Sequence, residues 1–196
     1  MTKSELRKLY LEKRKALTTG EVAEMSLLIA DRLFTSFDLR AIKTLHCFIS
    51  ISKFNEIDTS IIFQKIWNDF PNIDTLAPRM DRSIDELEHL PYTDASEMIE
   101  NSWGIREPAG TQKADPKKID LVLVPLLCFD ERGFRVGYGK GYYDRFLARC
   151  RPDCLKIGIS FFPPVDRIDD IHAGDIPLNW CVTPDRVYRF EAQRQR

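Results

Sequence analysis

The feature that most constrains the fold is an apolar run followed by a glycine-rich segment. Residues 120–125 read Asp-Leu-Val-Leu-Val-Pro, a pattern typical of a strand buried on both faces. Residues 135–144 read Arg-Val-Gly-Tyr-Gly-Lys-Gly-Tyr-Tyr-Asp, with three glycines at alternate positions. The residues after Gly141 fit a helix that carries Tyr143, Phe146 and Leu147. A buried strand, a glycine loop and a helix are therefore predicted in this order.

The glycine-rich segment, residues 135–144, has the chemistry of an anion site. Glycine tolerates positive φ and lets a ligand approach the backbone, so alternate glycines can present amide N–H groups. Arg135 and Lys140 add positive charge, and the N-terminus of the following helix strengthens the same field. The spacing differs from the G-x-x-x-x-G-K-[ST] nucleotide loop and from the dinucleotide fingerprint. Phosphate is the natural ligand of such a segment, and a glycine-rich turn that binds nothing is the alternative.

Helix and strand patterns alternate along the rest of the chain. Capping residues predict the starts of three helices. The first is at Thr2 with Glu5, the second at Thr18 with Glu21, and the third at Asp58 or Thr59. Short apolar runs predict strands at residues 44–50, 73–77, 120–125, 155–160 and 180–183. The expected class is α/β, a three-layer α/β/α fold with a mostly parallel sheet covered by helices on both faces. Residues 1–196 are expected to form one domain, in which residues 78–116 make a long connection with short strands near the ligand cleft.

Charge and cysteine content exclude several classes of function. The chain has 29 basic and 30 acidic residues and a formal net charge of −1, so we expect no general attraction to nucleic acid or an anionic membrane. The five cysteines are odd in number and form no C-x-x-C pair, which favours a reduced, cytoplasmic protein. No run approaches the ~20 apolar residues of a membrane span, and the charged N-terminus does not resemble a signal peptide. His46, His89 and His172 show no metal-ligand spacing, and His46 is expected in the core.

The complete string R-x-G-x-G-x-G-Y-Y-D, residues 135–144, resembles the signature of the 5-formyltetrahydrofolate cyclo-ligase family, also called 5,10-methenyltetrahydrofolate synthetases. Further segments resemble the family in the expected order, at residues 3–7, 55–59, 78–79, 103–108 and 174–177. The resemblance implies closure of 5-formyltetrahydrofolate to 5,10-methenyltetrahydrofolate with release of ADP and phosphate. ATP is then a co-substrate and Mg²⁺ a cofactor, and the partners are small molecules.

The resemblance also implies roles for individual residues. Lys3 and Arg7, four positions apart on the first predicted helix, match the family's nucleotide-contacting pair. Lys140 and Arg135 are expected to be catalytic, with Lys140 at the transferred phosphoryl group. The residues expected to wrap the triphosphate of ATP are Arg135, Val136, Gly137, Tyr138, Gly139, Lys140, Gly141, Tyr142 and Tyr143.

Substrate and metal contacts follow from the same resemblance. Asp144 and Asp175 match the family's two Mg²⁺ carboxylates, although either residue could instead be an ordinary cap. Trp103 can cover a flat ring or pack in the core. The residues expected to contact the folate are Ile51, Glu56, Trp103, Tyr138, Gly139, Lys140, Gly141 and Tyr142.

The chain departs from the family pattern at Tyr138, where an arginine is common, and before Asp175, where a histidine is often adjacent. The first change removes a cation next to the phosphates, and neither change removes a core group of the site. Two other functions stay open: a folate- or nucleotide-binding module without catalysis, and a phosphate-handling isomerase that uses Glu56 as its base. Dependence on ATP distinguishes them. A monomer is expected.

Overall fold

The computed structural model describes residues 1–81, 83, 85–101 and 104–191, so the predicted site residue Trp103 lies outside the described residues. The α-helices are α1 (Lys3–Lys15), α2 (Thr19–Ser36), α3 (Ser60–Asp69) and α4 (Tyr142–Arg149). The strands are β1 (Thr44–Cys47), β2 (Asp74–Asp81), β3 (Glu86–Pro91), β4 (Met98–Glu100), β5 (Arg106–Pro108), β6 (Leu121–Pro125), β7 (Cys128–Phe129), β8 (Arg135–Val136), β9 (Leu155–Ile159), β10 (Trp180–Val182) and β11 (Val187–Arg189).

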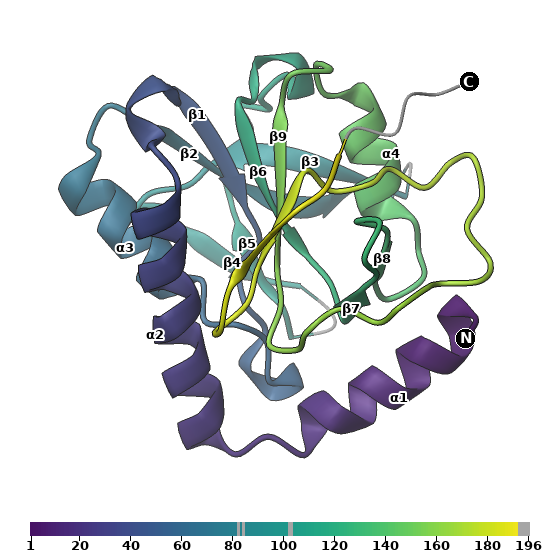
Figure 1. Ribbon diagram of the computed structural model, residues 1–196. Coiled ribbons are helices and arrows are strands. Elements are labelled where there is room, and N and C mark those ends of the chain that lie inside the picture. The colour runs from purple at the N-terminus through teal and green to yellow at the C-terminus, as the bar shows by residue number, and fades with distance from the viewer. Residues whose placement is uncertain (82, 84, 102–103, 192–196) are drawn as a thin grey trace.

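The main sheet contains seven strands in the order β11-β10-β9-β6-β1-β2-β3 (Figure 1). Neighbouring strands from β10 to β2 are parallel, and the edge strands β11 and β3 run antiparallel to their neighbours. The central strand β6 is the apolar run predicted from residues 120–125, and residues 121–124 have no exposed surface. The predicted α/β class with a mostly parallel sheet is confirmed.

Helices cover both faces of this sheet, as the three-layer prediction requires (Figure 1). α2 and α3 pack on one face, where Leu121 and Leu123 of β6 share a core cluster with residues of both helices. α4 packs on the other face, where Val122 and Val124 share a second cluster with Phe146. Because successive side chains of a strand point to opposite faces, a continuous apolar strand can serve both clusters.

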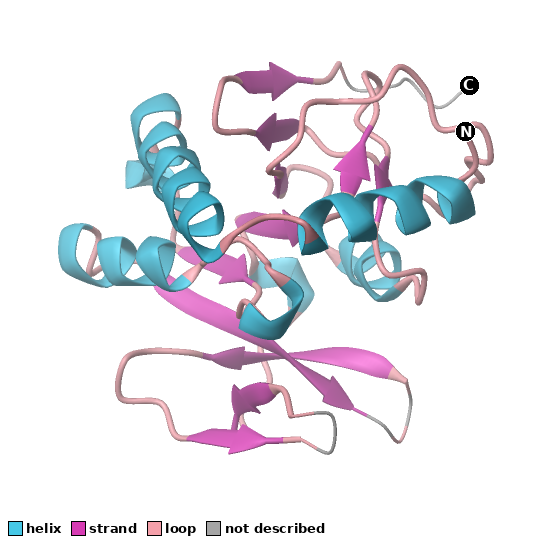
Figure 2. Cartoon of the chain, turned by 90° about the horizontal axis from the view of Figure 1, so that it is seen from below, coloured by secondary structure: helices cyan, strands magenta, loops and turns pink. Residues whose placement is uncertain are grey.

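Helix α1 lies outside these layers, across the end of the sheet where β6 leads into β7 (Figures 1 and 2). Its residues Leu6 and Tyr10 pack with Leu127 and Phe134 of the segment around the β7–β8 hairpin. The predicted capping boxes are present at the starts of both α1 and α2. This arrangement carries the N-terminal cations of α1 to the carboxyl ends of the parallel strands.

Two predicted strand limits differ from the structure by more than one residue, and pairing explains one of them. β2 continues past residue 77 to Asp81 because its second half pairs with β3. β1 ends at Cys47, before residue 50, and the chain then enters a 3-10 helix at Ser52–Phe54. The connection over residues 78–116 therefore holds the β2–β3 hairpin and the short β4–β5 ribbon, which lie beside each other (Figure 2). Within the described ranges, no helix combines the length and apolar character needed to cross a membrane.

Candidate active site

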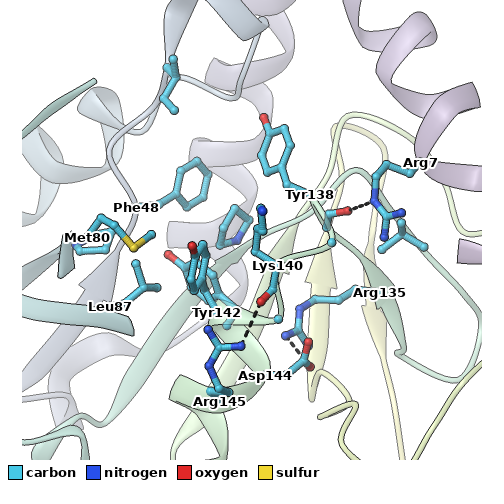
Figure 3. A pocket seen from close by; sticks show the side chains of 18 of the residues that line it. Arg7, Phe48, Met80, Leu87, Arg135, Tyr138, Lys140, Tyr142, Asp144 and Arg145 are labelled. Carbon is cyan, nitrogen blue, oxygen red and sulfur yellow. Dashed lines mark hydrogen bonds and ion pairs between the residues drawn. The ribbon is translucent and has the colours of Figure 1, made fainter. Parts of the chain in front are cut away.

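A cavity of about 660 Å³ lies where the order of the strands reverses direction (Figure 3). From β1 the chain proceeds to β2 and β3, whereas from β6 it proceeds the opposite way to β9 and β10. The loops that leave β1 and β6 therefore diverge, which leaves a crevice at the carboxyl ends of these strands. Phe48 and Ile49, directly after β1, and Pro125, at the end of β6, line the cavity.

The glycine-rich segment lines the same cavity along its whole length, from residue 135 to residue 144. Gly139 (φ 92°) and Gly141 (φ 69°) have left-handed backbone conformations that other residues rarely adopt. Gly141 is the N-cap of α4 and has no side chain with which to cap the helix. The first N–H groups of α4 can therefore donate to an anion, as the sequence predicts.

Lys3 and Arg7 both reach this cavity from α1, so their predicted common direction is confirmed. Arg7 Nε donates to the Gly137 carbonyl oxygen at 2.8 Å. The Arg7 guanidinium also covers Gly139, where an added Cβ atom would lie only 3.0 Å from its carbon. Lys3 Nζ lies 2.5 Å from Asp175 Oδ2. α1 thus joins the glycine loop to the segment around Asp175.

The two predicted catalytic cations differ in their surroundings. The Lys140 side chain points into the cavity (Figure 3) and makes no ion pair with any residue that the structure describes. Arg135 is 5% exposed, and it donates to Asp144 Oδ1 at 2.9 Å and to the Ile176 carbonyl at 2.5 Å. Burial lowers the pKa of Arg135, and the nearby carboxylate of Asp144 opposes that effect.

The predicted metal carboxylates, Asp144 and Asp175, line the same cavity. Asp144 lies in the first turn of α4, whose N-cap is Gly141, and its Oδ1 accepts hydrogen bonds from Arg135 and, at 3.0 Å, from the Ile176 amide, which lies outside this helix. Asp175 accepts from Lys3 and, at 2.8 Å, from the His172 amide. The described residues contain no cluster of three or more His, Cys, Asp or Glu side chains suited to a metal. Two carboxylates are nonetheless enough, because Mg²⁺ that is bound to phosphates takes only one or two ligands from the protein.

Glu56 lines the same cavity and contacts Tyr138 of the glycine-rich segment. The residue is 7% exposed, and its Oε2 accepts from the Ile51 amide at 2.8 Å. Its Oε1 accepts from the Tyr138 hydroxyl at 2.5 Å, and the Arg14 guanidinium donates to that same hydroxyl. Burial raises the pKa of Glu56, and the bonds from Tyr138 and Ile51 and the charge of Arg14 lower it. Tyr138 therefore faces a carboxylate, which explains how tyrosine is accommodated where the family often has arginine.

Sequence reasoning missed several residues of this site. Arg14 lies on the same face of α1 as Lys3 and Arg7, and this helical spacing was the signal that could have identified it. Phe48, Met80 and Leu87 form an apolar wall near Tyr142 (Figure 3). No sequence signal could have identified Met80 and Leu87, because the pairing of β2 with β3 brings them to the cavity. Tyr142 itself donates to Asp85 Oδ1 at 2.6 Å.

Comparison with known proteins agrees with this geometry. The sequence model of the 5-formyltetrahydrofolate cyclo-ligase family matches residues 1–165. The 5-formyltetrahydrofolate cyclo-ligase of Escherichia coli K12 is 28% identical over 186 residues, which cover 91% of this chain and 98% of that protein. The solved structure of 5,10-methenyltetrahydrofolate synthetase from Aquifex aeolicus has a TM-score of 0.82 at 28% identity, covering 100% of this chain and 96% of that one. The corresponding enzyme from Mycoplasma pneumoniae has a TM-score of 0.74 at 27% identity, with 94% and 99% covered. The chain belongs to the 5-formyltetrahydrofolate cyclo-ligase family, as its glycine-rich segment predicted.

Proposed function

We propose that this enzyme uses ATP and Mg²⁺ to convert 5-formyltetrahydrofolate to 5,10-methenyltetrahydrofolate, releasing ADP and phosphate. The observation that supports this most directly is that one cavity is lined by a cationic glycine loop, by the buried carboxylate of Glu56 and by an apolar wall. The cationic loop suits a triphosphate, and the carboxylate with the apolar wall suits a flat ring with several N–H donors. We further propose that the whole chain acts as one monomeric unit in the cytoplasm.

The reaction requires activation of a formamide, which is a poor electrophile. Attack of the formyl oxygen on the γ-phosphorus gives an imidate phosphate and ADP. N10 then attacks the formyl carbon, loses its proton, and phosphate departs to leave the methenyl bridge. Phosphoryl transfer depends mainly on positioning and on neutralisation of the phosphate oxygens, so the protein needs no covalent nucleophile.

On the phosphate side, Lys140 is the cation available to the transferred group, because it points into the cavity and makes no ion pair with the described residues. The N–H groups at the start of α4 add donors for phosphate oxygens. Arg7 holds the loop through Gly137, and Lys3 is held beside Asp175. We assign both to ATP.

Asp144 and Asp175 would hold Mg²⁺, since both carboxylates line the cavity beside the glycine loop. When bound, the ion neutralises charge on the phosphate oxygens. Arg135 fixes the orientation of Asp144 from its buried side. A direct contact between Arg135 and phosphate stays a prediction.

On the substrate side, Glu56 is the acceptor for the donor-rich pterin ring, with Ile51 holding its second oxygen. Phe48, Met80 and Leu87 can pack against the ring faces. A binding module without catalysis and an isomerase are disfavoured by family membership and by the retention of Lys140.

The deciding assay mixes the purified protein with 5-formyltetrahydrofolate, ATP and Mg²⁺ and follows the absorbance of the methenyl product. We expect one ADP per product and no product without ATP. Folded protein that forms no product would exclude the cyclo-ligase reaction, and product without ATP would exclude the proposed activation step.

A further inference from the structure

Arg14 is a buried cation that the phosphate chemistry does not use. The residue is 6% exposed at the end of α1, and its guanidinium donates to the Tyr138 hydroxyl. The guanidinium carbon lies 5.4 Å from the centre of the Tyr138 ring, and Arg14 Nε has no hydrogen-bond partner in the described part of the chain. A buried charge is costly unless an opposite charge compensates for it. The compensating group must therefore lie close by.

That group is Glu56, on the far side of the Tyr138 hydroxyl. The hydroxyl donates its own proton to Glu56 Oε1 at 2.5 Å while it accepts from Arg14. Because a guanidinium can only donate, its bond leaves the tyrosine oxygen free to direct its single proton at the carboxylate. Arg14, Tyr138 and Glu56 form one hydrogen-bonded chain with opposite charges at its ends.

Asn55 also joins the segments that carry Arg14 and Glu56. Asn55, directly before Glu56, has a left-handed conformation (φ 47°). Its side-chain amide donates to the carbonyl oxygens of Arg14 at 3.1 Å and Leu17 at 2.9 Å. The end of α1 thus holds the loop that carries Glu56, independently of the Arg14 side chain.

We propose that Arg14 is a positioning residue which, through Tyr138, keeps Glu56 ionised and oriented to accept hydrogen bonds from the folate substrate. The proposal rests on the proposed function for its substrate, although the coupling between the three residues can be measured without turnover. An ionised carboxylate offers lone pairs to further donors after it has accepted from Ile51 and Tyr138, whereas a protonated one offers fewer. Arg14 itself touches no substrate in this assignment.

Within the described part of the chain, the ionisable groups that face Glu56 are Arg14 from α1, Tyr138 from the glycine loop and Tyr143 from α4. Burial raises the pKa of Tyr143 well above its usual value, so this phenol stays neutral. Burial raises the pKa of Glu56, and Arg14 is the positive charge that opposes this rise. Removing that charge should shift the titration of Glu56 to higher pH, by about one unit for an opposite charge a few ångströms away.

The first experiment is carbon-13 NMR of the glutamate carboxyl groups in the ligand-free protein, with the Glu56 signal assigned by its loss in Glu56→Gln. We expect Arg14→Met and Tyr138→Phe to raise the titration midpoint of Glu56 by about one pH unit, and Arg14→Lys to restore it toward that of the unchanged protein. Arg14→Met retains the main-chain carbonyl that Asn55 binds. If this variant does not fold, Tyr138→Phe still tests the coupling, because Tyr138 is 46% exposed and loses only its hydroxyl. An unchanged midpoint in the folded variants would overturn the proposal.

The second experiment measures kcat/KM for 5-formyltetrahydrofolate and for ATP across pH. In Arg14→Met the acidic limb of the folate profile should move to higher pH, with about a fivefold loss relative to the unchanged protein one unit below the new midpoint and recovery above it. The KM for ATP should stay within about twofold. Equal losses for both substrates at all pH values would mean that Arg14 only supports the fold. A protein that makes no methenyl product would instead refute the proposed function, and the NMR result would still decide the coupling.

Discussion

Replacing Asp144 by asparagine separates its charge from its other contacts. Asp144 Oδ1 accepts from Arg135 and from the Ile176 amide, and an asparagine oxygen can accept the same two bonds. What the substitution removes is the negative charge beside Arg135, whose side chain is 5% exposed. The variant therefore leaves a buried guanidinium without its counter-charge.

The expected loss of stability follows from the exposed fractions of the Arg135 and Asp144 side chains. Removing one partner of a fully buried ion pair costs about 3–5 kcal/mol. Asp144 is 29% exposed, so water already screens part of its interaction, and we expect a loss of about 2–3 kcal/mol. For a chain of this length that corresponds to a melting temperature lower by about 5–10 °C.

The measurement is urea unfolding of Asp144→Asn beside Asp38→Asn as a matched control. Asp38 also accepts from a backbone amide and pairs with an arginine, Arg40, but the two side chains are 61% and 85% exposed. The control should show no measurable change, and adding Arg135→Met to Asp144→Asn should recover part of the lost stability. Equal stability of Asp144→Asn and the unchanged protein, or an equal loss in Asp38→Asn, would refute the argument.

The same variant also tests the metal role at a temperature where it is folded. Turnover should be low at limiting Mg²⁺ and rise in part as Mg²⁺ is added, because asparagine is a weaker ligand than a carboxylate. Near-normal turnover of the folded variant at limiting Mg²⁺ would mean that the ion is held elsewhere.

Three further predictions concern the ligand sides and the core. Glu56→Gln should raise the KM for folate about tenfold and leave the Kd for ATP within about twofold in calorimetric titration, since a neutral amide is a weaker acceptor; equal losses would contradict the assignment. Gly139→Ala should weaken ATP binding, because residue 139 has φ 92° and its Cβ would press on Arg7, whereas Gly110→Ala, with nothing within 4 Å, should not; equal affinities would count against a contact between loop and phosphate. Burial lowers the pKa of His89 to about 4, so the contribution of His89 to stability should be constant above pH 6.5 and fall by about 3 kcal/mol as the pH drops to 4 and only the unfolded state gains a proton; His46, whose pKa burial also lowers, should add to this fall. Urea midpoints should show this slope, and the slope should be smaller in His89→Gln; an identical slope would assign the effect to other groups.

Local patterns predicted much of the fold because the information lies in short stretches of sequence. Both capping boxes, at Thr2 and Thr18, are formed by residues three positions apart, and the apolar run of β6 needs only its own composition. The glycine string likewise predicted a loop before a helix and, through its resemblance, the family. The wrong limit of β2 shows where this reasoning ends, because its extension depends on pairing with β3.

The composition of the site was decided by tertiary structure. Lys3 meets Asp175 across 172 positions, and Tyr138 meets Glu56 across 82. The sequence by itself determined that cations, glycines and carboxylates were available, but not that Asp144 would neutralise a buried Arg135 in place of capping a helix. The partners of these side chains depend on two features of the fold. One is which loops diverge where the strand order reverses, and the other is where α1 crosses the end of the sheet. These are properties of the packed chain, because the contacts that stabilise them join segments whose local patterns carry no record of one another.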